Sequence, residues 1–367
     1  MPQLWTRTSV QRIAALALAT VAIPAFAQHY KQTNLTSDQP GASFPDSNLV
    51  NPWGLARSST SPWWVSDNGT GRSTLYDSTG KPLSLVVTVP PGDPTTNKSG
   101  NPTGIIFNGG TGFTLAPGLP AVFLFVTEDG TISGWNPKAD PTNAIIKVNT
   151  KGSSVFKGAT IATVKLEFIG QASFLYAADF HNGRVRVYDS NFDRATWLEW
   201  GFRDFTLPPG YAPFNIQNIG GNLYVSFAKQ DSEKHDEVDG AGLGYVDVFS
   251  PTGQLLHRLQ HGPWMNAPWG LVLASGDFGI YSHDVLVGQF GDGTIAVFDP
   301  VTGSFKGHLR DSFGLIIKND GLWGLSFGNG ATAGPANTLY FSAGTNHEQD
   351  GLLGSITAVE NPQGNDQ

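Results

Sequence analysis

A five-residue motif that opens a repeat constrains this chain more than any other feature of its sequence. The motif reads Asn-Pro-Trp-Gly-Leu at residues 51–55, and related segments follow at 101–105, 157–161, 212–216, 267–271 and 321–325. The second residues of the six segments are at positions 52, 102, 158, 213, 268 and 322, so successive copies lie 50 to 56 residues apart. A period of this length indicates an array of structural repeats.

The residues between copies favour short β-strands. Alternating or apolar runs of four to eight residues are bounded by Gly, Asn, Asp and Pro, and helical periodicity is lacking. In the fifth repeat we predict strands at 269–273, 284–288, 294–299 and 304–309. Several second strands end in tight-turn sequences such as Asp67-Asn68-Gly69. Six repeats of four antiparallel strands predict an all-β fold, a six-bladed β-propeller with four-stranded antiparallel blades.

The two ends of the chain are predicted to meet in the last blade. After Gly321 the sequence offers only three strands, at 322–327, 338–343 and 354–359. We expect the fourth strand to come from residues 30–36, because a ring closed in this way leaves no exposed sheet edge at the junction. The prediction is therefore a single propeller domain over residues 28–360, followed by a polar C-terminal tail at 361–367.

The first 27 residues have the pattern of a signal peptide. Arg7 and Arg12 precede an apolar run at 13–23, and Ala25-Phe26-Ala27 follows it. The run is too short to span a bilayer, and no later segment comes closer to the required length. We therefore expect export to the periplasm or the exterior, with no membrane span. The chain has no cysteine, so no disulfide can stabilise it there.

The charge balance limits the classes of partner. Of 22 basic and 30 acidic residues, Arg7 and Arg12 leave with the signal peptide, so the mature net charge is 20 − 30 = −10. An acidic surface argues against nucleic acid as a partner and suits cations or neutral ligands. We expect a monomer that binds a small polar ligand or a protein partner.

The segment at 179–188 resembles the NHL repeat, which has Asp, two residues, Asn, one residue, Arg and then an alternating strand. Together with the signal peptide and the Asn-Pro-Trp-Gly start, the chain resembles a bacterial family of exported NHL-like propellers that has no assigned function. The resemblance implies a six-bladed propeller. It also implies that Asp179 and Asp67 pair with the arginines five residues on, Arg184 and Arg72, and hold their turns.

Propeller topology brings one set of loops together around the mouth of the central channel. These are the loops entering each opening strand and the loops after each second strand. Aligned on their apolar cores, the second strands end at Asp67, Glu128, Asp179, Phe227, Gln289 and Ala343. The entering loops contribute Asn51, Asn101, Asn215 and Asn266.

Carboxylate and amide oxygens that converge at one mouth can hold Ca²⁺ or another divalent cation. No arginine follows Glu128 in the manner of Arg184, so Glu128 is the most available carboxylate, and we predict a metal set of Glu128, Asn101 and Asp179. Enzymes of the gluconolactonase family, also six-bladed propellers, use a similar set of Glu, Asn and Asp. The full predicted ligand-binding set is Asn51, Asn101, Asp67, Glu128, Asp179, Gln289, His181 and His347.

Histidines and a charged insertion are also predicted at the mouth. His181, His235, His261 and His347 fall on that face, but no short metal-ligand motif joins them, so we interpret most as surface residues. His347, next to Glu348, is the first to test. The acidic segment at 230–240 is interpreted as a flexible solvated loop, with a lid or a partner contact as alternatives.

The aromatic position of the motif holds Trp53, Phe214, Trp269 and Trp323, with Thr103 and Ala159 in the other two repeats. Such rings at a channel mouth could stack on a sugar or another flat ligand. We favour the interpretation that they fill the space between adjacent blades.

The sequence therefore leaves three hypotheses for function. The first is an exported binding scaffold that uses its channel-mouth face for a ligand or partner. The second is a divalent-metal-dependent hydrolase or lyase of the gluconolactonase type. The third is a structural protein associated with the cell envelope.

Overall fold

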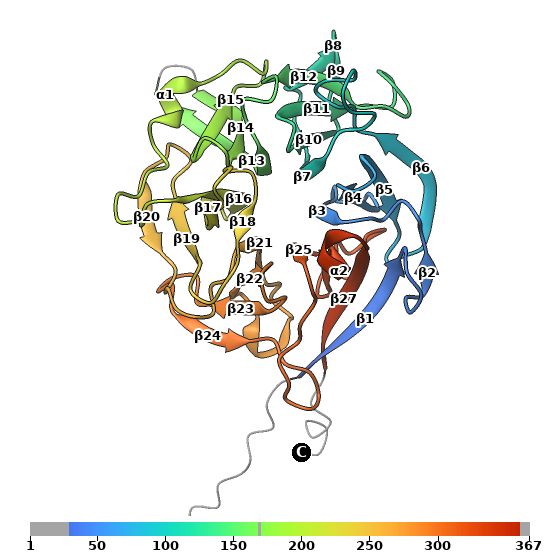
Figure 1. Cartoon of the computed structure of the whole chain (residues 1–367), viewed down its shortest axis with the longest axis vertical. Coiled ribbons are helices and arrows are strands. Elements are labelled where there is room, and N and C mark those ends of the chain that lie inside the picture. Colours follow the sequence, from blue (N-terminus) through green and yellow to red (C-terminus); the bar gives the residue numbers. More distant parts are fainter. Residues whose placement is uncertain (1–28, 168–169, 360–367) are drawn as a thin grey trace, which may run out of the picture.

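The computed structural model describes residues 29–167 and 170–359. Six small antiparallel sheets surround a common axis, which confirms the six-bladed propeller (Figure 1). The predicted signal peptide at 1–27 and the polar tail at 361–367 lie outside the described residues. Within those residues, no helix has the length and apolar composition that crossing a membrane requires.

The blades follow one another in chain order. Blade 1 contains β3 (Pro52–Ala56), β4 (Trp63–Asp67), β5 (Arg72–Tyr76) and β6 (Pro82–Thr88). Blade 2 contains β7 (Pro102–Phe107), β10 (Phe123–Thr127), β11 (Thr131–Trp135) and β12 (Ile145–Asn149), and beside it lies a small hairpin of β8 (Thr114–Ala116) and β9 (Leu119–Pro120). Blade 3 contains β13 (Phe156–Leu166), β14 (Gly170–Asp179) and β15 (Arg184–Tyr188).

The second half of the ring repeats the arrangement. Blade 4 contains β16 (Tyr211–Ile219), β17 (Asn222–Gln230), β19 (Gly244–Phe249) and β20 (Leu255–Arg258), with the short β18 (Glu237–Val238) paired to β17. Blade 5 contains β21 (Pro268–Leu273), β22 (Val285–Gln289), β23 (Ile295–Phe298) and β24 (Phe305–His308). Blade 6 contains β25 (Leu322–Phe327), β26 (Leu339–Ala343), β27 (Leu352–Val359) and β1 (His29–Ser37), which also pairs with β2 (Phe44–Pro45).

The ring closes through β1, as the sequence predicts. This strand pairs antiparallel with β27, from His29 opposite Val359 to Ser37 opposite Leu352. Tyr30 is buried in the core shared by blades 5 and 6, and its hydroxyl donates a hydrogen bond to the carbonyl oxygen of Phe278 at 3.0 Å. The first described strand is therefore part of the last blade's packing as well as of its sheet.

Blade 3 departs from the predicted four strands, because the described residues supply only three. After β15 the chain turns back and forms the short helix α1 (Thr196–Glu199). The Glu199 carboxylate accepts a hydrogen bond from the backbone N–H of Val187 at 3.2 Å. A side chain thus satisfies part of the edge that a fourth strand would cover in the other blades.

The strand register corrects the alignment of the third repeat. Pro52, the second residue of the first motif, lies opposite Asp67, the last residue of the second strand. In blade 3 the residue opposite Asp179 is Phe156, so this copy of the motif begins at 155 rather than 157. Lys157 therefore occupies the aromatic position of the motif, where the sequence alignment had placed Ala159.

In the five blades other than blade 4, the inner strand approaches the next one closely at the motif's glycine. A Cβ atom on Gly54 would lie 2.6 Å from the carbonyl oxygen of Thr103 in blade 2, and one on Gly324 would lie 2.5 Å from that of Trp53 in blade 1. Real Cβ atoms do not come this near, so only glycine permits the approach. In blade 4 the position holds Asn215, whose Nδ2 instead donates a hydrogen bond to the carbonyl oxygen of Trp269 at 2.7 Å.

The aromatic residues of the motif meet inside the central channel and close it. The Trp53 and Trp323 rings stack with centroids 3.5 Å apart, and Trp269 meets both edge-on at 5.8 Å. Phe214 and Phe180 pack against this group, and we call these five buried residues the aromatic plug. The rings meet across the axis, which corrects the interpretation that they fill the space between adjacent blades.

Substitution of a motif glycine tests the close approach of the inner strands. We expect Gly324→Ala to lower the free energy of unfolding by about 1–3 kcal/mol, because the new methyl group collides with the Trp53 backbone. Gly110→Ala is the matched control, since a Cβ there meets only the Asn108 side chain at an ordinary 3.4 Å. Urea unfolding followed by circular dichroism measures both, and equal small effects would contradict the packing described.

Candidate functional site

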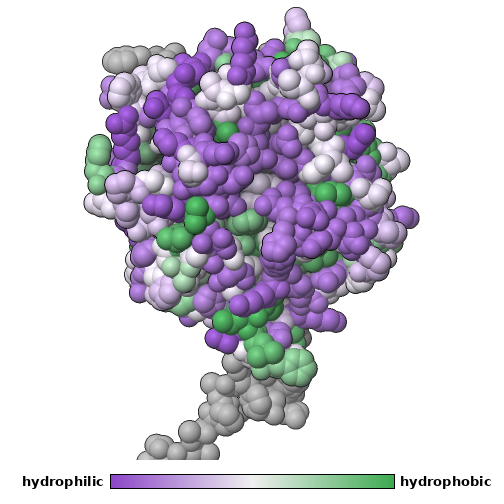
Figure 2. Space-filling model, viewed as in Figure 1, coloured by the Kyte–Doolittle hydropathy of each residue, from purple (hydrophilic) through white to green (hydrophobic). Residues whose placement is uncertain are grey.

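Three segments converge over the plug on the face where the inner strands begin, which we call the mouth. They are the turn after β10, the flap at 231–238 between β17 and β19, and the turn α2 (Thr345–Glu348). In Figure 1, α2 and β18 lie close to the centre of the ring. Figure 2 shows hydrophilic side chains over most of the area around that centre.

Lys157 lies at the base of the mouth with its side chain only 1% exposed. Its ammonium group donates to Glu128 Oε1 at 2.5 Å and to Asp236 Oδ1 at 3.0 Å. The same nitrogen lies 5.1 Å from the centroid of the Trp53 ring and 5.9 Å from that of Phe180. The ammonium is therefore held between two carboxylates and two faces of the plug.

The environment of Lys157 fixes its charge. Burial disfavours the ammonium form, but Glu128, Glu237 and Asp236 outweigh it, so the pKa of Lys157 is raised above its ordinary value. Lys157 is therefore a permanent cation and is not available as a base at neutral pH.

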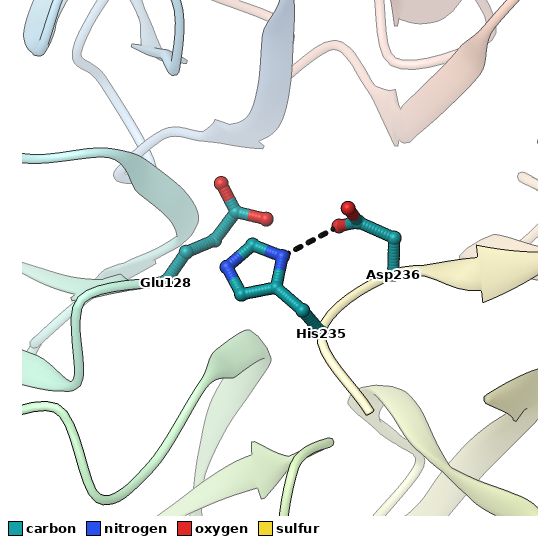
Figure 3. Close-up of side chains that lie close together, drawn as sticks. All are labelled: Glu128, His235 and Asp236. Carbon is teal, nitrogen blue, oxygen red and sulfur yellow. Dashed lines mark hydrogen bonds and ion pairs between the residues drawn. The ribbon is translucent and has the colours of Figure 1, made fainter. Parts of the chain in front are cut away.

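The flap is tied down by hydrogen bonds of its own. The backbone N–H of Asp231 donates to the carbonyl oxygen of Asp236 at 2.9 Å, and β18 continues the ladder of β17. His235 Nδ1 donates to Asp236 Oδ1 at 2.9 Å, and Glu128 points toward this pair from the facing blade (Figure 3). The segment expected to be a solvated loop thus places an imidazole and a carboxylate over the mouth.

Hydrogen bonding between these two residues shifts both pKa values. The bond from His235, with Lys157 nearby, holds the pKa of Asp236 well below its usual range. The same bond raises the pKa of His235, although partial burial opposes it. Asp236 is therefore ionised at neutral pH, and His235 is more readily protonated than a free imidazole.

Glu237 and Glu348 add two further carboxylates with the opposite shift. Burial raises the pKa of Glu237 to about 7, and Glu348 and Asp236 add to that effect while Lys157 opposes it. Burial also raises the pKa of Glu348, although Asn51 Nδ2 donates to its Oε2 at 2.7 Å. Each carboxyl group therefore keeps its proton to a higher pH than an exposed glutamate does.

Backbone strain presents Glu348 to the mouth. Asn346, His347 and Glu348 have φ values of 55°, 54° and 64°, so three consecutive residues other than glycine adopt the left-handed conformation. Each such residue costs about 1–3 kcal/mol and needs support from its surroundings. Asp320 and Asp350 supply part of it, by accepting hydrogen bonds from the Asn346 backbone and side chain.

The net charge of the mouth is negative. Glu128, Asp236, Glu237 and Glu348 face one ammonium, Lys157, and one imidazole, His235. With every group ionised and His235 protonated, two negative charges are uncompensated. Burial is the main cause of the raised pKa values of Glu237 and Glu348, and the neighbouring carboxylates raise them further.

Three of the predicted ligand-binding residues lie inside blades and form hydrogen bonds within the chain. Asp179 accepts hydrogen bonds from Ser154, Asn182 and Arg186. Asp67 accepts one at Oδ2 from Thr74, and its buried Oδ1 has no hydrogen-bond partner among the described residues. Gln289 bonds to the backbone of Asn266 and Val287.

The turn pairings that the NHL resemblance implied differ from those observed. Arg186, rather than Arg184, forms the ion pair with Asp179, and Thr74, rather than Arg72, contacts Asp67. Each partner is the diagonal neighbour seven residues on, which lies on the same face of the sheet as the aspartate.

Asn51 is buried, and both ends of its side-chain amide form hydrogen bonds within the chain. Its Oδ1 accepts a hydrogen bond from Trp323 Nε1 at 3.0 Å, and its Nδ2 is the donor to Glu348. It therefore joins the plug to the acidic groups, which corrects the expectation that it is free to meet a ligand. Asn101 is half-buried, and its carbonyl oxygen accepts from the backbone N–H of Glu128 at 3.0 Å.

The two predicted histidines lie at the edge of the site. His181 Nδ1 lies 3.3 Å from the carbonyl oxygen of Lys234, so it contacts the flap. His347 is exposed within the left-handed turn.

One member of the predicted metal set belongs to the group that the structure brings together. The ligand atoms of Glu128, His235 and Asp236 lie within 4.8 Å of one another. Asp179 is not part of this group, because its carboxylate forms hydrogen bonds inside blade 3. The other two members of the group, His235 and Asp236, come from the flap.

Sequence reasoning missed Lys157, Asp236, Glu237 and Glu348 as parts of the site. A signal for Lys157 was present, because alignment of the third repeat on Gly158 places the lysine at the motif's aromatic position. No short sequence pattern identifies Glu237 or Glu348 as site residues. The contacts that bring them to the mouth join segments far apart in sequence.

Comparison with known proteins finds viral relatives and propeller structures. No family model matches the chain. Uncharacterized protein L690 of Acanthamoeba polyphaga mimivirus is 34% identical over 331 residues, which cover 86% of this chain and 82% of the viral one. Uncharacterized protein R648 of the same virus is 32% identical over 337 residues, with 89% and 79% covered.

Among solved structures, a glucose dehydrogenase has a TM-score of 0.54 at 13% identity, over 90% of this chain and 100% of its own. A protein of unknown function from Bacteroides thetaiotaomicron also has a TM-score of 0.54, at 12% identity, over 91% of this chain and 77% of its own. A streptogramin B lyase has a TM-score of 0.50 at 11% identity, over 90% and 98%. At such low identity these likenesses show the fold alone.

Removal of Lys157 tests its role as the counter-ion of the mouth. We expect Lys157→Met to lower the free energy of unfolding by about 3–5 kcal/mol, because the Glu128 carboxylate loses its partner in a largely buried place. The double variant with Glu128→Gln should be less destabilised than the sum of the two single changes. Additive effects in urea unfolding would show that the pair is not coupled.

The raised pKa of Glu237 predicts a dependence of stability on pH. The folded state keeps the proton up to about pH 7, while the unfolded chain loses it near the ordinary value of 4.5. The unfolded state therefore binds fewer protons between these values, and stability from this group falls as pH rises through that window.

Glu237→Gln should remove that loss. We expect the variant to gain of the order of 1 kcal/mol over the wild type at pH 8, an amount reduced for residual solvent contact, and nothing at pH 4. Exposed Glu233→Gln in the same flap is the control. A gain that is equal at both pH values would contradict the assignment.

Proposed function

This chain belongs to the family of the mimivirus proteins L690 and R648, and we propose that it is an exported binding propeller whose acidic mouth holds a small cationic ligand. Export rests on the signal-peptide pattern at 1–27, and a mature N-terminus at Gln28 would support it. The ligand is a divalent metal ion or an organic ammonium ion, which share the positive charge that the site lacks.

The observation that carries the proposal is the excess of carboxylates at the mouth. Blades 2, 4 and 6 each send acidic side chains to one place, over a channel that the aromatic plug closes. Like charges brought together in a half-buried site destabilise the fold unless a proton or another cation compensates them. A bound cation would supply that compensation at neutral pH.

Acceptor atoms are available for such a ligand. Within residues 29–167 and 170–359, Asp236 Oδ2 and Glu348 Oε1 accept no hydrogen bond, since the bonds to these two carboxylates go to Asp236 Oδ1 and Glu348 Oε2. Lys157 itself illustrates how an ammonium group is held here, by carboxylates on one side and aromatic rings on the other. A second cation would lie farther out, between the flap and α2.

Calorimetric titration tests the proposal with Ca²⁺, Mn²⁺, Zn²⁺ and 1,4-diaminobutane as probes, at pH 8. We expect at least one probe to bind and Glu348→Gln to weaken it about tenfold or more, the usual effect of losing one hydrogen bond to a charged group. Glu233→Gln removes the same charge from an exposed place and should have little effect. The proposal is wrong if no probe binds, or if both variants weaken binding equally.

A second candidate function is that of a metal-dependent hydrolase or lyase. The proximity of Glu128, His235 and Asp236 favours it. A divalent ion held there would polarise a carbonyl group or activate water. Lys157 opposes this use, because its ammonium already contacts Glu128 and Asp236.

His235→Ala separates the two candidates. If a metal ion is held by Glu128, His235 and Asp236, the substitution should abolish its binding and any turnover of γ-butyrolactone, a simple lactone probe. If the mouth holds an ammonium ion between carboxylates, binding of 1,4-diaminobutane should survive. Absence of metal-dependent turnover in the wild type would rule out the lactonase form of the second candidate.

A further inference from the structure

The half of the channel beyond the plug, away from the mouth, contains two adjoining cavities. A small space of about 30 Å³ lies against Trp269 and is lined by the inner strands of all six blades. A larger one of about 380 Å³ shares Leu55, Ile105, Ala159 and Gln217 with it and extends to the ends of those strands. We call the two together the lower channel, and the larger part alone has the volume of a small-ligand pocket.

Arg57 lines the lower channel without an acidic partner. Its Nε donates to the carbonyl oxygen of Phe327 at 2.5 Å, and its guanidinium carbon lies 5.9 Å from the centroid of the Trp63 ring. Among the residues that the structure describes, no carboxylate lies within ion-pair distance of it. Burial lowers the pKa of Arg57, and no neighbouring charge offsets that effect.

The rest of the wall is mostly apolar, and its other polar residues are Thr160, Asn215, Gln217 and Ser326. Leu55, Phe107 and Ile161 are half-buried and line the larger space. Gln217 lines both spaces, and within the described residues its side-chain amide forms no hydrogen bond. The lower channel thus combines the Arg57 guanidinium without a counter-ion, the Gln217 amide without a hydrogen-bond partner, and an apolar surface.

We propose that the lower channel binds a small organic carboxylate. Its anionic group pairs with Arg57, with Gln217 as a second polar contact, and its apolar part lies against Leu55, Phe107 and Ile161. Guanidinium groups bind carboxylates through paired hydrogen bonds, and a partly buried one without a counter-ion has most to gain from such a ligand.

This site is independent of the mouth. The aromatic plug separates the two, and their charges are opposite, so a ligand suited to one is unsuited to the other. The proposed cation site therefore neither supports nor weakens this assignment, and Glu348→Gln should leave carboxylate binding unchanged.

Comparison of hexanoate with its neutral amide tests the proposal on the intact protein. We expect hexanoate to bind, in calorimetric titration, about tenfold or more tightly than hexanamide, because only the acid offers a charge to Arg57. Arg57→Gln should remove that preference, and Arg57→Lys should keep part of it. Arg203→Gln, which removes an exposed guanidinium elsewhere, is the charge-matched control and should bind as the wild type does.

Two further measurements test the proposal even if the Arg57→Gln variant fails to fold. The preference for hexanoate over hexanamide needs only the wild type. Ile161→Trp should fill the cavity and abolish hexanoate binding while the thermal unfolding curve shows a folded protein. Failure of hexanoate to bind the wild type, equal binding of acid and amide, or unchanged binding to the Arg57→Gln or Ile161→Trp variant would each overturn the proposal.

Discussion

The close approach of neighbouring inner strands at the motif's glycines is the constraint on which the rest of the structure depends. At Gly54, Gly270 and Gly324, the carbonyl oxygen of the next inner strand lies 2.5 or 2.6 Å from where a Cβ would be. The residue before each of these three glycines is a tryptophan that projects toward the axis, and the three tryptophans meet there. The close approach at the glycines therefore both narrows the ring and brings the tryptophans together in the channel.

The plug in turn determines what the mouth can do. Lys157 takes the motif's aromatic position in blade 3, so an ammonium group appears where the equivalent residues of four other blades contribute rings. Glu128 and Asp236 are drawn to it, and Glu237 and Glu348 gather around them with pKa values raised by burial. Three consecutive left-handed residues at 346–348 destabilise their turn, and this strained backbone places Glu348 at the mouth. Strained backbone of this kind is concentrated at functional sites.

The period of the motif and the turn sequences were enough to predict six blades and the closing strand. They succeeded because propeller blades are local units, in which each strand pairs mainly with its neighbour in sequence. The missing fourth strand of blade 3 was not predicted, because the chain after β15 covers that edge with isolated contacts, a backbone hydrogen bond from Ala195 to Val187 and the side-chain bond of Glu199, which no periodicity reveals.

The site was predicted less well, for reasons that particular residues show. Glu128 was identified, but the strand register places Thr127, rather than Glu128, opposite Pro102, so Glu128 lies one residue beyond the strand-end position assumed for it. Asp179 and Gln289 do occupy that position, but their side chains form hydrogen bonds inside their own blades. Glu237 and Glu348 reach the mouth through a flap and a strained turn, and neither geometry is encoded in a short pattern.

The most direct test of the central claim, that uncompensated carboxylates make the mouth a cation site, is the pKa of Glu237 itself. Carbon-detected NMR of its side-chain carboxyl group can follow the titration with and without 1,4-diaminobutane or Ca²⁺. The account predicts a pKa of about 7 in the free protein and a lower value once the cation is bound. An ordinary pKa that neither probe moves would contradict it.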